Sequence, residues 1–345
     1  MRVKLGDVCE RGTSNLKLSD VSEKNGEFSV FGASGYIGSV DFYQQGYPYV
    51  AVVKDGAGIG RAMLCPGKTS VIGTMQYLLP KDNILPKYLF YVVKYMNLEK
   101  YFTGATIPHI YFKDYKNEEF NFDFWERQVE IVSVLSKCEK VIDLCKQELQ
   151  LLDKLIKARF VELFGDPELN PRGLPVLPWN AVFLTTTGKL DSNAMVENGR
   201  YPFFTCAKES YKINSYAFDC EALLLAGNNA AGIYDVKHYK GKFNAYQRTY
   251  VLRLMNEKWS YILFKRQLED KLQYLQSQSK GTNTRYLTLG ILNELRFVVP
   301  PVAEQEQFAV FVEQTDKSKL AIQQSLDKLK TLRKSLMQEY YGQGE

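Results

Sequence analysis

Residues 126–164 of this chain read ERQVEIVSVLSKCEKVIDLCKQELQLLDKLIKARFVELF, a pattern that predicts one long helix. Its apolar residues recur at alternating steps of three and four, as in a helix whose narrow seam packs against another helix. The seam consists of Leu135, Cys138, Ile142, Cys145, Leu149, Leu152 and Ile156. Gly165, Asp166 and Pro167 end the helix. At 1.5 Å per residue it would be about 58 Å long, and its seam needs a partner.

The partner is a second copy of the pattern, 177 residues further along at 303–341. Without a gap, this offset gives 11 identical pairs over the 62 positions 104–165, where composition alone would give about 4. The pairs are Gly104/Gly281, Phe120/Phe297, Gln128/Gln305, Lys140/Lys317, Gln147/Gln324, Leu149/Leu326, Leu152/Leu329, Leu155/Leu332, Lys157/Lys334, Glu162/Glu339 and Gly165/Gly342. The seam recurs at Val312, Thr315, Ile322, Leu326 and Leu329, with interruptions at Lys319 and Arg333. Because an accidental common period does not produce identities at one offset, a duplication is the better interpretation.

Length and composition indicate an ordinary protein of two or three domains. No apolar run approaches the roughly 20 residues of a membrane span, and the opening MRVKLGDVCERG lacks the apolar core of a secretion signal. The six cysteines form no CxxC pair. Cys138 and Cys145 lie on the helix seam, where buried thiols are a better explanation than a metal or redox site. Free thiols favour a reducing compartment, so we expect a cytoplasmic protein.

The net charge of +5 is unevenly distributed. Residues 178–301 hold 16 Lys/Arg and 10 Asp/Glu, a net +6, whereas residues 1–121 hold 14 and 12, a net +2. The stretches 122–177 and 302–345, which contain the two predicted helices, are net −2 and −1. A positive surface outside the helices suits a polyanion such as nucleic acid, although many proteins with a mild excess bind none.

The segments outside the helices also repeat in outline. FSVFGASGYI corresponds to YPFFTCAKES and PYVAVVKDGAGI to EALLLAGNNAAGI, short apolar runs bounded by Gly that are typical of strands. In the first domain, an early Pro and periodic aromatic residues also predict a helix across 86–102. We therefore predict an α+β chain with two tandem strand-rich domains and two long antiparallel helices, which form a central coiled coil with approximate two-fold symmetry. The predicted segments are a domain at 1–124, a helix at 125–164, a Pro/Gly-rich linker at 165–178, a domain at 179–301 and a helix at 302–342.

Motifs for catalysis or cofactor binding are weak. Residues 62–69, AMLCPGKT, fit a relaxed phosphate-loop pattern, but the residues after them predict a strand rather than the helix that such a loop opens. A hairpin turn is the better interpretation. Gly56, Gly58 and Gly60 do not complete a GxGxxG motif and are better explained by tight turns. The two histidines are not in metal-ligand spacing. We expect no catalytic, cofactor-binding or metal-binding residue.

Three motifs and their order resemble those of a known family. They are a helix ending in Leu-Phe-Gly-Asp-Pro (Leu163–Pro167), a loop that begins Gly-Thr and ends in Leu (Gly281–Leu287), and a Pro-Pro-x-x-Glu-Gln entry into the second long helix (Pro300, Pro301, Glu304, Gln305). With the duplication, the whole chain resembles the specificity subunit of type I restriction-modification enzymes. The first copy departs from this pattern, because residues 123–126 stand where the Pro-Pro entry is expected and only Gln128 is kept. That entry turn is expected to differ.

The resemblance implies a non-catalytic DNA reader. In this family each globular unit is a target-recognition domain for one half of a bipartite DNA site. The paired helices set the spacing between the half-sites and dock DNA adenine methyltransferase (modification) subunits, expected to number two. S-adenosylmethionine would then bind the modification subunits, and ATP and Mg would bind a restriction subunit where one joins. Readers roughly 50 Å apart would span about 15 base pairs. The resemblance also places the chain in the cytoplasm of a bacterium or archaeon, away from membranes.

For DNA contacts we expect loop residues with side chains that read base edges or phosphates. In the second domain these are Asn228, Asn229, Gln247 and Arg248, and in the first they are Lys54, Arg61, Lys68 and Gln76. Thr106 with His109, and Asn283 with Arg285 and Tyr286, follow the shared glycines and are candidates for backbone contacts. For each residue the alternative is an ordinary solvated loop position.

A rival interpretation from another class is an interaction scaffold, in which two glycan- or peptide-binding lobes sit on a coiled-coil spacer. The many aromatic residues, 23 Tyr and 20 Phe, permit it, although most of them must be core. Salt-dependent binding to DNA would separate the two. A hydrolase ranks third, because the sequence contains no recognisable cluster of acid, base and nucleophile.

Overall fold

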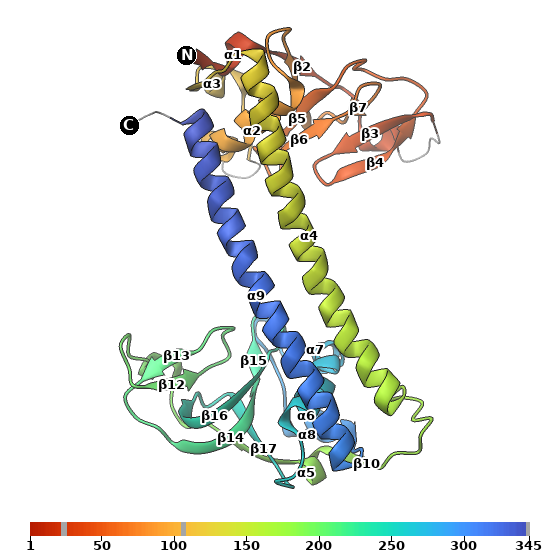
Figure 1. Ribbon diagram of the computed structural model, residues 1–345, viewed down its shortest axis with the longest axis vertical. Coiled ribbons are helices and arrows are strands. Elements are labelled where there is room, and N and C mark those ends of the chain that lie inside the picture. Colours follow the sequence, from red (N-terminus) through yellow and green to blue (C-terminus); the bar gives the residue numbers. More distant parts are fainter. Residues whose placement is uncertain (22–25, 105–107, 343–345) are drawn as a thin grey trace. The chain divides into compact units, whose positions relative to one another are not determined.

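The computed structural model describes residues 1–21, 26–104 and 108–342 (Figure 1). Its contacts divide the chain into two compact units, Met1–Gln147 with Ile322–Glu345 and Glu148–Ala321, each described by itself below. Two 40-residue helices, α4 (Trp125–Phe164) and α9 (Val302–Tyr341), contribute a segment to each unit. Each unit therefore contains one globular part and a segment of both long helices.

The globular part of the first unit has a four-stranded antiparallel sheet of order β2-β8-β5-β6 and a three-stranded sheet of order β4-β3-β7. The strands are β1 (Arg2–Lys4), β2 (Cys9–Thr13), β3 (Phe28–Gly32), β4 (Gly35–Val40), β5 (Tyr49–Val53), β6 (Ala62–Cys65), β7 (Ser70–Val71), β8 (Met75–Pro80) and β9 (Glu119–Asn121). The helices are α1 (Leu5–Val8), α2 (Pro86–Met96) and α3 (Phe112–Tyr115), with short 3₁₀ turns at Leu18–Asp20 and Leu98–Tyr101. β5 is buried along its whole length because its two faces contribute to two different core clusters, and this explains its unbroken apolar sequence.

The second unit is built the same way around a six-stranded sheet of order β11-β17-β14-β16-β12-β13. The strands are β10 (Val176–Pro178), β11 (Phe183–Thr187), β12 (Tyr201–Phe204), β13 (Tyr211–Ile213), β14 (Phe218–Ala226), β15 (Asn228–Asn229), β16 (Val236–Ala245), β17 (Thr249–Leu254), β18 (Arg285–Tyr286) and β19 (Arg296–Val298). The helices are α5 (Trp179–Val182), α6 (Tyr261–Asp270), α7 (Leu272–Gln278) and α8 (Leu289–Asn293), with a 3₁₀ turn at Ser192–Ala194. Strand β14, like β5, divides its apolar residues between two core clusters.

Strand pairing confirms that the two units repeat one fold. The first strand of each globular part pairs antiparallel with its last, β1 with β9 and β10 with β19. A hairpin is then joined in parallel to another strand of the unit, β3–β4 to β7 and β12–β13 to β16. The predicted architecture of strand-rich domains with long helices is therefore present.

The long helices are antiparallel within each unit. In the first unit the start of α4 contacts the end of α9, and Cys138 Sγ lies 3.8 Å from the carbonyl oxygen of Leu329. In the second unit the end of α4 contacts the start of α9, and the rings of Phe160 and Phe164 each lie 5.6 Å from that of Phe308 in edge contacts. In each unit the segments of the long helices also pack on that unit's globular part, so that helices and globular part share one core cluster.

The predicted seam residues are buried or half-buried. Leu135, Cys138, Ile142, Ile156, Val312, Thr315 and Leu326 are buried, and Cys145, Leu149, Leu152, Ile322 and Leu329 are half-buried. Neighbouring Leu151 and Leu155 are exposed, so the seam is narrow. Lys319, which interrupts the pattern, is accommodated because its Nζ lies 2.6 Å from the Asp153 carboxylate on α4.

Two local expectations need correction. The residues after β6 do not form a hairpin, because β6 pairs with β5 whereas β7 pairs in parallel with β3. The turn between them instead carries the chain from one sheet to the other and holds Lys68 at a φ of 57°. The helix predicted from residue 86 ends at Met96, because Asn97 adopts the left-handed conformation that stops it.

Candidate nucleic-acid interface

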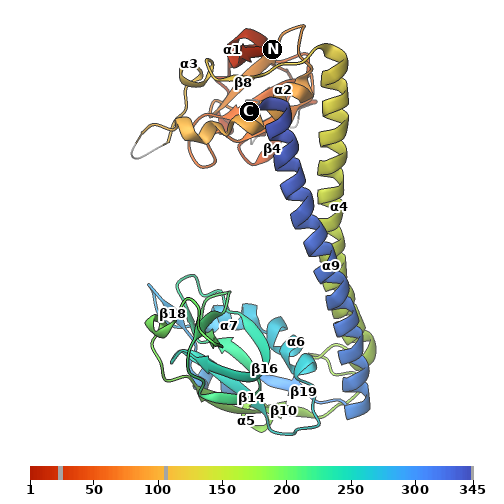
Figure 2. The ribbon, with the colours of Figure 1, turned by 60° about the vertical axis from the view of Figure 1, so that its left-hand side comes forward.

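A small hairpin at residues 280–286 forms the centre of the candidate site in the second unit. The backbone groups of Lys280 and Tyr286 exchange two hydrogen bonds of 3.0 and 2.8 Å, and Gly281 makes the turn with a φ of 98°. This conformation is open to glycine and strained for other residues. One side of the hairpin, β18, pairs with β15, so Asn228 lies opposite Tyr286. In Figure 2, β18 lies at the end of the second unit that is remote from α9.

The adjoining β16–β17 turn brings two more predicted residues to the same place. The amide of Gly227 donates to the carbonyl of Arg248 at 2.8 Å, and the amide of Leu287 donates to the carbonyl of Gly227 at 2.8 Å. Gln247, Arg248, Asn283, Arg285 and Tyr286 are exposed. The fold therefore gathers the predicted residues of the second domain on one surface.

Not all of these side chains are free to bind a ligand. The Asn229 carboxamide oxygen accepts from the backbone amides of Ala231 (2.8 Å) and Ile233 (3.3 Å), so this residue shapes its own turn. The Arg285 guanidinium donates to the carbonyl of Gln276 at 3.2 Å, which holds one edge of the side chain. Cys206 lies behind the turn, where its Sγ donates to the carbonyl of Arg248 at 3.5 Å.

The first unit contains the corresponding hairpin. The backbone groups of Thr103 and His109 exchange two hydrogen bonds of 2.8 Å, and Gly104 has a φ of 97°. The imidazole Nδ1 of His109 lies 2.7 Å from the Asp55 carboxylate, and the Lys54 ammonium lies 3.7 Å from the same residue. Predicted residues Lys54 and His109 are thus brought together, whereas Thr106 lies outside the described residues.

The remaining residues predicted for the first domain are dispersed, and one must be corrected. Arg61 is exposed and donates to the carbonyl of Ala33 at 3.2 Å. Lys68 lies on the turn between two sheets. Gln76 is not a surface residue: it is 3 % exposed in β8, and its amide donates to the Tyr115 hydroxyl at 2.9 Å. Because this contact is in the core, Gln76 is unsuited to touching a base.

Two residues at these sites were missed by the sequence analysis. Asp55, the partner of His109, was hidden because its contact spans 54 residues of sequence. Tyr47 is 86 % exposed, and its loop is joined to the turn of Lys68 by two hydrogen bonds between Gln45 and Thr69. A signal for Tyr47 was present, since it stands between Gly46 and Pro48, where a large aromatic residue has no strand to pack into.

The other histidine is also bonded to a carboxylate. His238 Nε2 lies 2.9 Å from Glu221, and its ring is stacked on Tyr261 at 5.5 Å. Although burial acts to raise it, the pKa of the Glu221 carboxyl is lowered by hydrogen bonds from Lys240 and His238. Within the described part of the chain, no three His, Cys, Asp or Glu side chains come together as a metal site requires.

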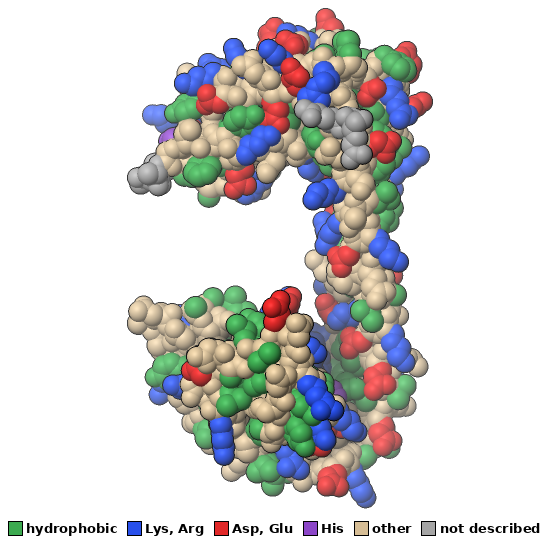
Figure 3. Space-filling model, turned by 90° about the vertical axis from the view of Figure 1, so that its left-hand side faces the viewer, with side chains coloured by type: hydrophobic (Ala, Val, Ile, Leu, Met, Phe, Trp, Pro, Cys, Tyr) green, Lys and Arg blue, Asp and Glu red, His purple; other side chains and the backbone are tan. Residues whose placement is uncertain are grey.

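The surface charge is diffuse. On the face of the second unit visible in Figure 3, Lys and Arg side chains are spread among uncharged ones rather than gathered in one patch. A diffuse positive surface attracts a polyanion without fixing its position. Among residues 1–21, 26–104 and 108–342, no helix has the length and apolar character needed to cross a membrane.

Comparison with known proteins agrees with this architecture. The family model described as the type I restriction modification DNA specificity domain matches residues 1–154 and again residues 182–331. The chain belongs to this family.

Two relatives are named as specificity subunits of type I restriction enzymes. The specificity subunit of the type I restriction enzyme EcoDI from Escherichia coli is 36% identical over 173 residues, which are 48% of this chain and 38% of that subunit. The MjaIX specificity subunit from Methanocaldococcus jannaschii is 24% identical over 304 residues, 75% of this chain and 69% of that one. Among solved structures, the S subunit of a type I system from M. genitalium gives a TM-score of 0.68 at 16% identity, covering 100% of this chain and 96% of that chain, and so supports the fold.

Proposed function

We propose that this chain is the DNA-recognition subunit of a type I restriction-modification complex and performs no chemistry itself. Each recognition domain, 1–124 and 179–301, reads one half of a bipartite duplex site. The helices at 125–164 and 302–342 set the number of base pairs between the half-sites and dock adenine methyltransferase subunits, two per chain. S-adenosylmethionine then binds those subunits, and ATP and Mg bind a restriction subunit where one is present.

The observation that supports this proposal most directly is the hairpin built twice with different side chains. Gly104 and Gly281, 177 residues apart, have φ values of 97° and 98°, and each follows a residue whose backbone exchanges two hydrogen bonds with the residue six positions on. The sequences after the two glycines differ in residue type. A shared backbone with divergent exposed side chains is what two readers of different sequences need, because scaffolds position the variable residues that confer specificity. Arg and Asn at the second hairpin are side-chain types that read purine edges in the major groove.

The test is a binding and methylation assay on the chain reconstituted with its modification subunits. We expect duplex binding that is weak for the chain alone, tighter for the complex, and selective for one pair of half-sites. Single-molecule methylation mapping in cells that carry the gene and its neighbours would identify the target. A complex with no preference among duplex sequences would contradict the proposal.

The spacing role has its own test. Deleting one heptad from both helices removes about 10 Å of rise and should shorten the recognised gap by about three base pairs while leaving both half-sites unchanged. A recognised gap of unchanged length would refute this role of the helices.

A further inference from the structure

Two glutamines occupy the same buried position in the two units. Gln128 and Gln305 are 177 residues apart, each lies in the first turn of its long helix, and each is 0 % exposed. A buried carboxamide is costly unless both its oxygen and its nitrogen are hydrogen-bonded. Both side chains meet this condition, and they do so by the same arrangement.

Gln305 joins the second recognition domain to α9. Its Oε1 accepts from the backbone amide of Ser260 at 2.9 Å, and its Nε2 donates to the carbonyl of Pro300 at 2.8 Å. Ser260 is the residue immediately before α6, and Pro300 lies at the entry to α9. One side chain therefore links the first turn of the domain's helix to the first turn of the long helix.

Gln128 makes the equivalent bonds in the first unit. Its Oε1 accepts from the backbone amide of Leu85 at 2.9 Å, directly before α2, and its Nε2 donates to the carbonyls of Asn83 (3.0 Å) and Asp123 (2.9 Å). A further contact joins α2 to α4 in this unit, because the Tyr91 hydroxyl donates to the Glu139 carboxylate at 2.8 Å. The same carboxylate also pairs with a lysine of α2 at 2.8 Å.

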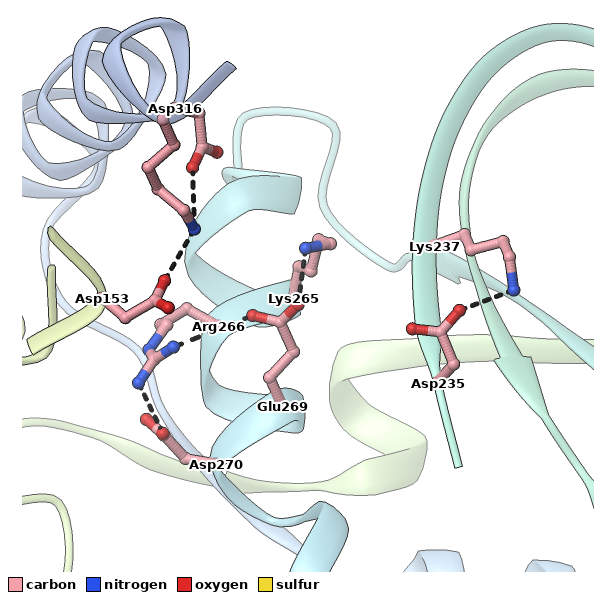
Figure 4. Close-up of polar contacts among 9 residues, drawn as sticks. Asp153, Asp235, Lys237, Lys265, Arg266, Glu269, Asp270 and Asp316 are labelled. Carbon is pink, nitrogen blue, oxygen red and sulfur yellow. Dashed lines mark hydrogen bonds and ion pairs between the residues drawn. The ribbon is translucent and has the colours of Figure 1, made fainter. Parts of the chain in front are cut away.

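Beyond Gln305, in contrast, α6 faces a cleft of about 810 Å³ bounded by α4 and α9 of the same unit. Figure 4 shows that the charged side chains of α6 on this side pair with each other. Lys265 bonds Glu269 at 2.6 Å, and Arg266 bonds Asp270 at 2.7 Å. The apolar contacts around Phe308 hold the two helices together but are not directional. Gln305 thus supplies directional bonds where α6 begins.

We infer that Gln305, and Gln128 with support from its neighbours, are positioning residues that fix the orientation of each recognition domain on its long helix and thereby the gap between the half-sites. This inference rests on the proposed function, since a gap has meaning only for a bipartite site. It makes a prediction that a role in general stability does not make. Loss of these hydrogen bonds should weaken the preference for one gap length and leave the preferred sequence of each half-site unchanged.

The experiment measures methylation rates by the full chain assembled with its modification subunits. The substrates are duplexes carrying both half-sites at the native gap and at gaps one base pair longer or shorter. The Gln305→Met variant keeps the side-chain volume but removes both hydrogen bonds. We expect the preference of Gln305→Met for the native gap to fall about tenfold, because two hydrogen bonds are lost. The preference of Gln128→Met should fall only about threefold, because neighbouring contacts between α2 and α4 remain.

Gln307→Met on α9 and Gln147→Met on α4 are matched controls, because both glutamines are exposed on the same helices. They should keep the wild-type gap preference. Gln305→Glu provides a rescue, since a protonated carboxyl can donate and accept as the amide does and burial favours that neutral form. Its gap preference should match that of wild type at about pH 6 and decrease at higher pH, where the carboxyl ionises. This variant keeps the inference falsifiable should Gln305→Met fail to fold.

If a folded Gln305→Met variant keeps the wild-type gap preference, the inference is overturned and the proposed function is not. An equal loss of rate at every gap, or a Gln305→Glu profile that follows wild type at all pH values, would have the same consequence. A wild-type complex with no gap preference at all would overturn the proposed function and the inference with it.

Discussion

The hairpins at Gly104 and Gly281 are closed in the same way and differ in chemistry. Both begin with a glycine at nearly the same φ, and both are closed by a pair of backbone hydrogen bonds six residues apart. In the first unit Asp55 lies opposite His109 and its carboxylate lies 2.7 Å from the imidazole Nδ1, whereas in the second Asn228 lies opposite Tyr286. The fold therefore places side chains at equivalent positions in the two units, and the residue types at those positions differ.

The electrostatic consequence differs between the units as well. The first hairpin places a carboxylate beside its basic residues, since Asp55 contacts both His109 and Lys54. In the second unit the hairpin and the adjoining β16–β17 turn each present an exposed arginine, Arg285 and Arg248. With a net charge of +6 in residues 178–301 against +2 in residues 1–121, the second domain should supply more of the attraction to a duplex.

The largest expected effect comes from breaking a hairpin turn. In Gly281→Ala the added methyl carbon would lie 2.2 Å from the Thr284 carbonyl oxygen, at a φ of 98° that alanine rarely adopts. Strain of roughly 1–3 kcal/mol together with this overlap should weaken binding to the second half-site by about a hundredfold. The measurement is the apparent Kd of the assembled complex for duplexes with either half-site altered.

Gly104→Ala provides the reciprocal test, and it should weaken binding to the first half-site instead. Gly173→Ala in the linker is the control, because its φ is also positive but no atom lies within 4 Å of the added carbon. Equal losses at both half-sites from Gly281→Ala would contradict the assignment of one hairpin to each.

The next effect should come from a single side chain of the second hairpin. Arg285→Ala is expected to weaken specific binding by about five- to a hundredfold, the range for loss of a bidentate base contact, and to relax preference at one or two positions of that half-site. Lys258→Ala removes the same charge from an exposed turn before α6 and should change affinity little. Similar losses from both variants would indicate that Arg285 acts only through its charge.

A smaller effect should appear in the salt dependence. Arg248→Ala should reduce the slope of log K against log salt by about one, as expected for one lost phosphate contact. Lys54→Ala should reduce it by less, because the Lys54 ammonium already lies 3.7 Å from the Asp55 carboxylate. Titrations at four salt concentrations would measure both slopes. A larger change for Lys54→Ala would reverse the ranking of the two domains.

The smallest effect concerns the carboxylate of the first hairpin. Asp55→Asn removes the negative charge beside Lys54 and His109 and should tighten non-specific duplex binding by about two- to threefold. Asp41→Asn, an exposed carboxylate in the same unit, controls for net charge. Equal gains from both variants would show that only net charge matters and that Asp55 has no local role.

Repetition and periodicity were readable from the sequence because each depends on local spacing. The heptad seam indicated both long helices, and the constant offset indicated a duplicated fold. Long-range pairing was not readable: nothing near Gln76 indicates that Tyr115, 39 residues away, accepts its hydrogen bond in the core. For the same reason Asp55 was missed, and the turn at Lys68 was mistaken for a hairpin although its flanking strands belong to different sheets.

The distribution of cysteines has a practical consequence for observing DNA engagement. Burial raises the pKa of the Cys9 thiol to about 12 and that of Cys65 to about 11, so both should resist alkylation near neutral pH. Cys206 is only half-buried and lies directly behind the turn that presents Arg248. Once Cys145 and Cys220, which are also half-buried, are replaced by serine, the labelling rate of Cys206 by a maleimide dye would report occupancy of the second domain in real time.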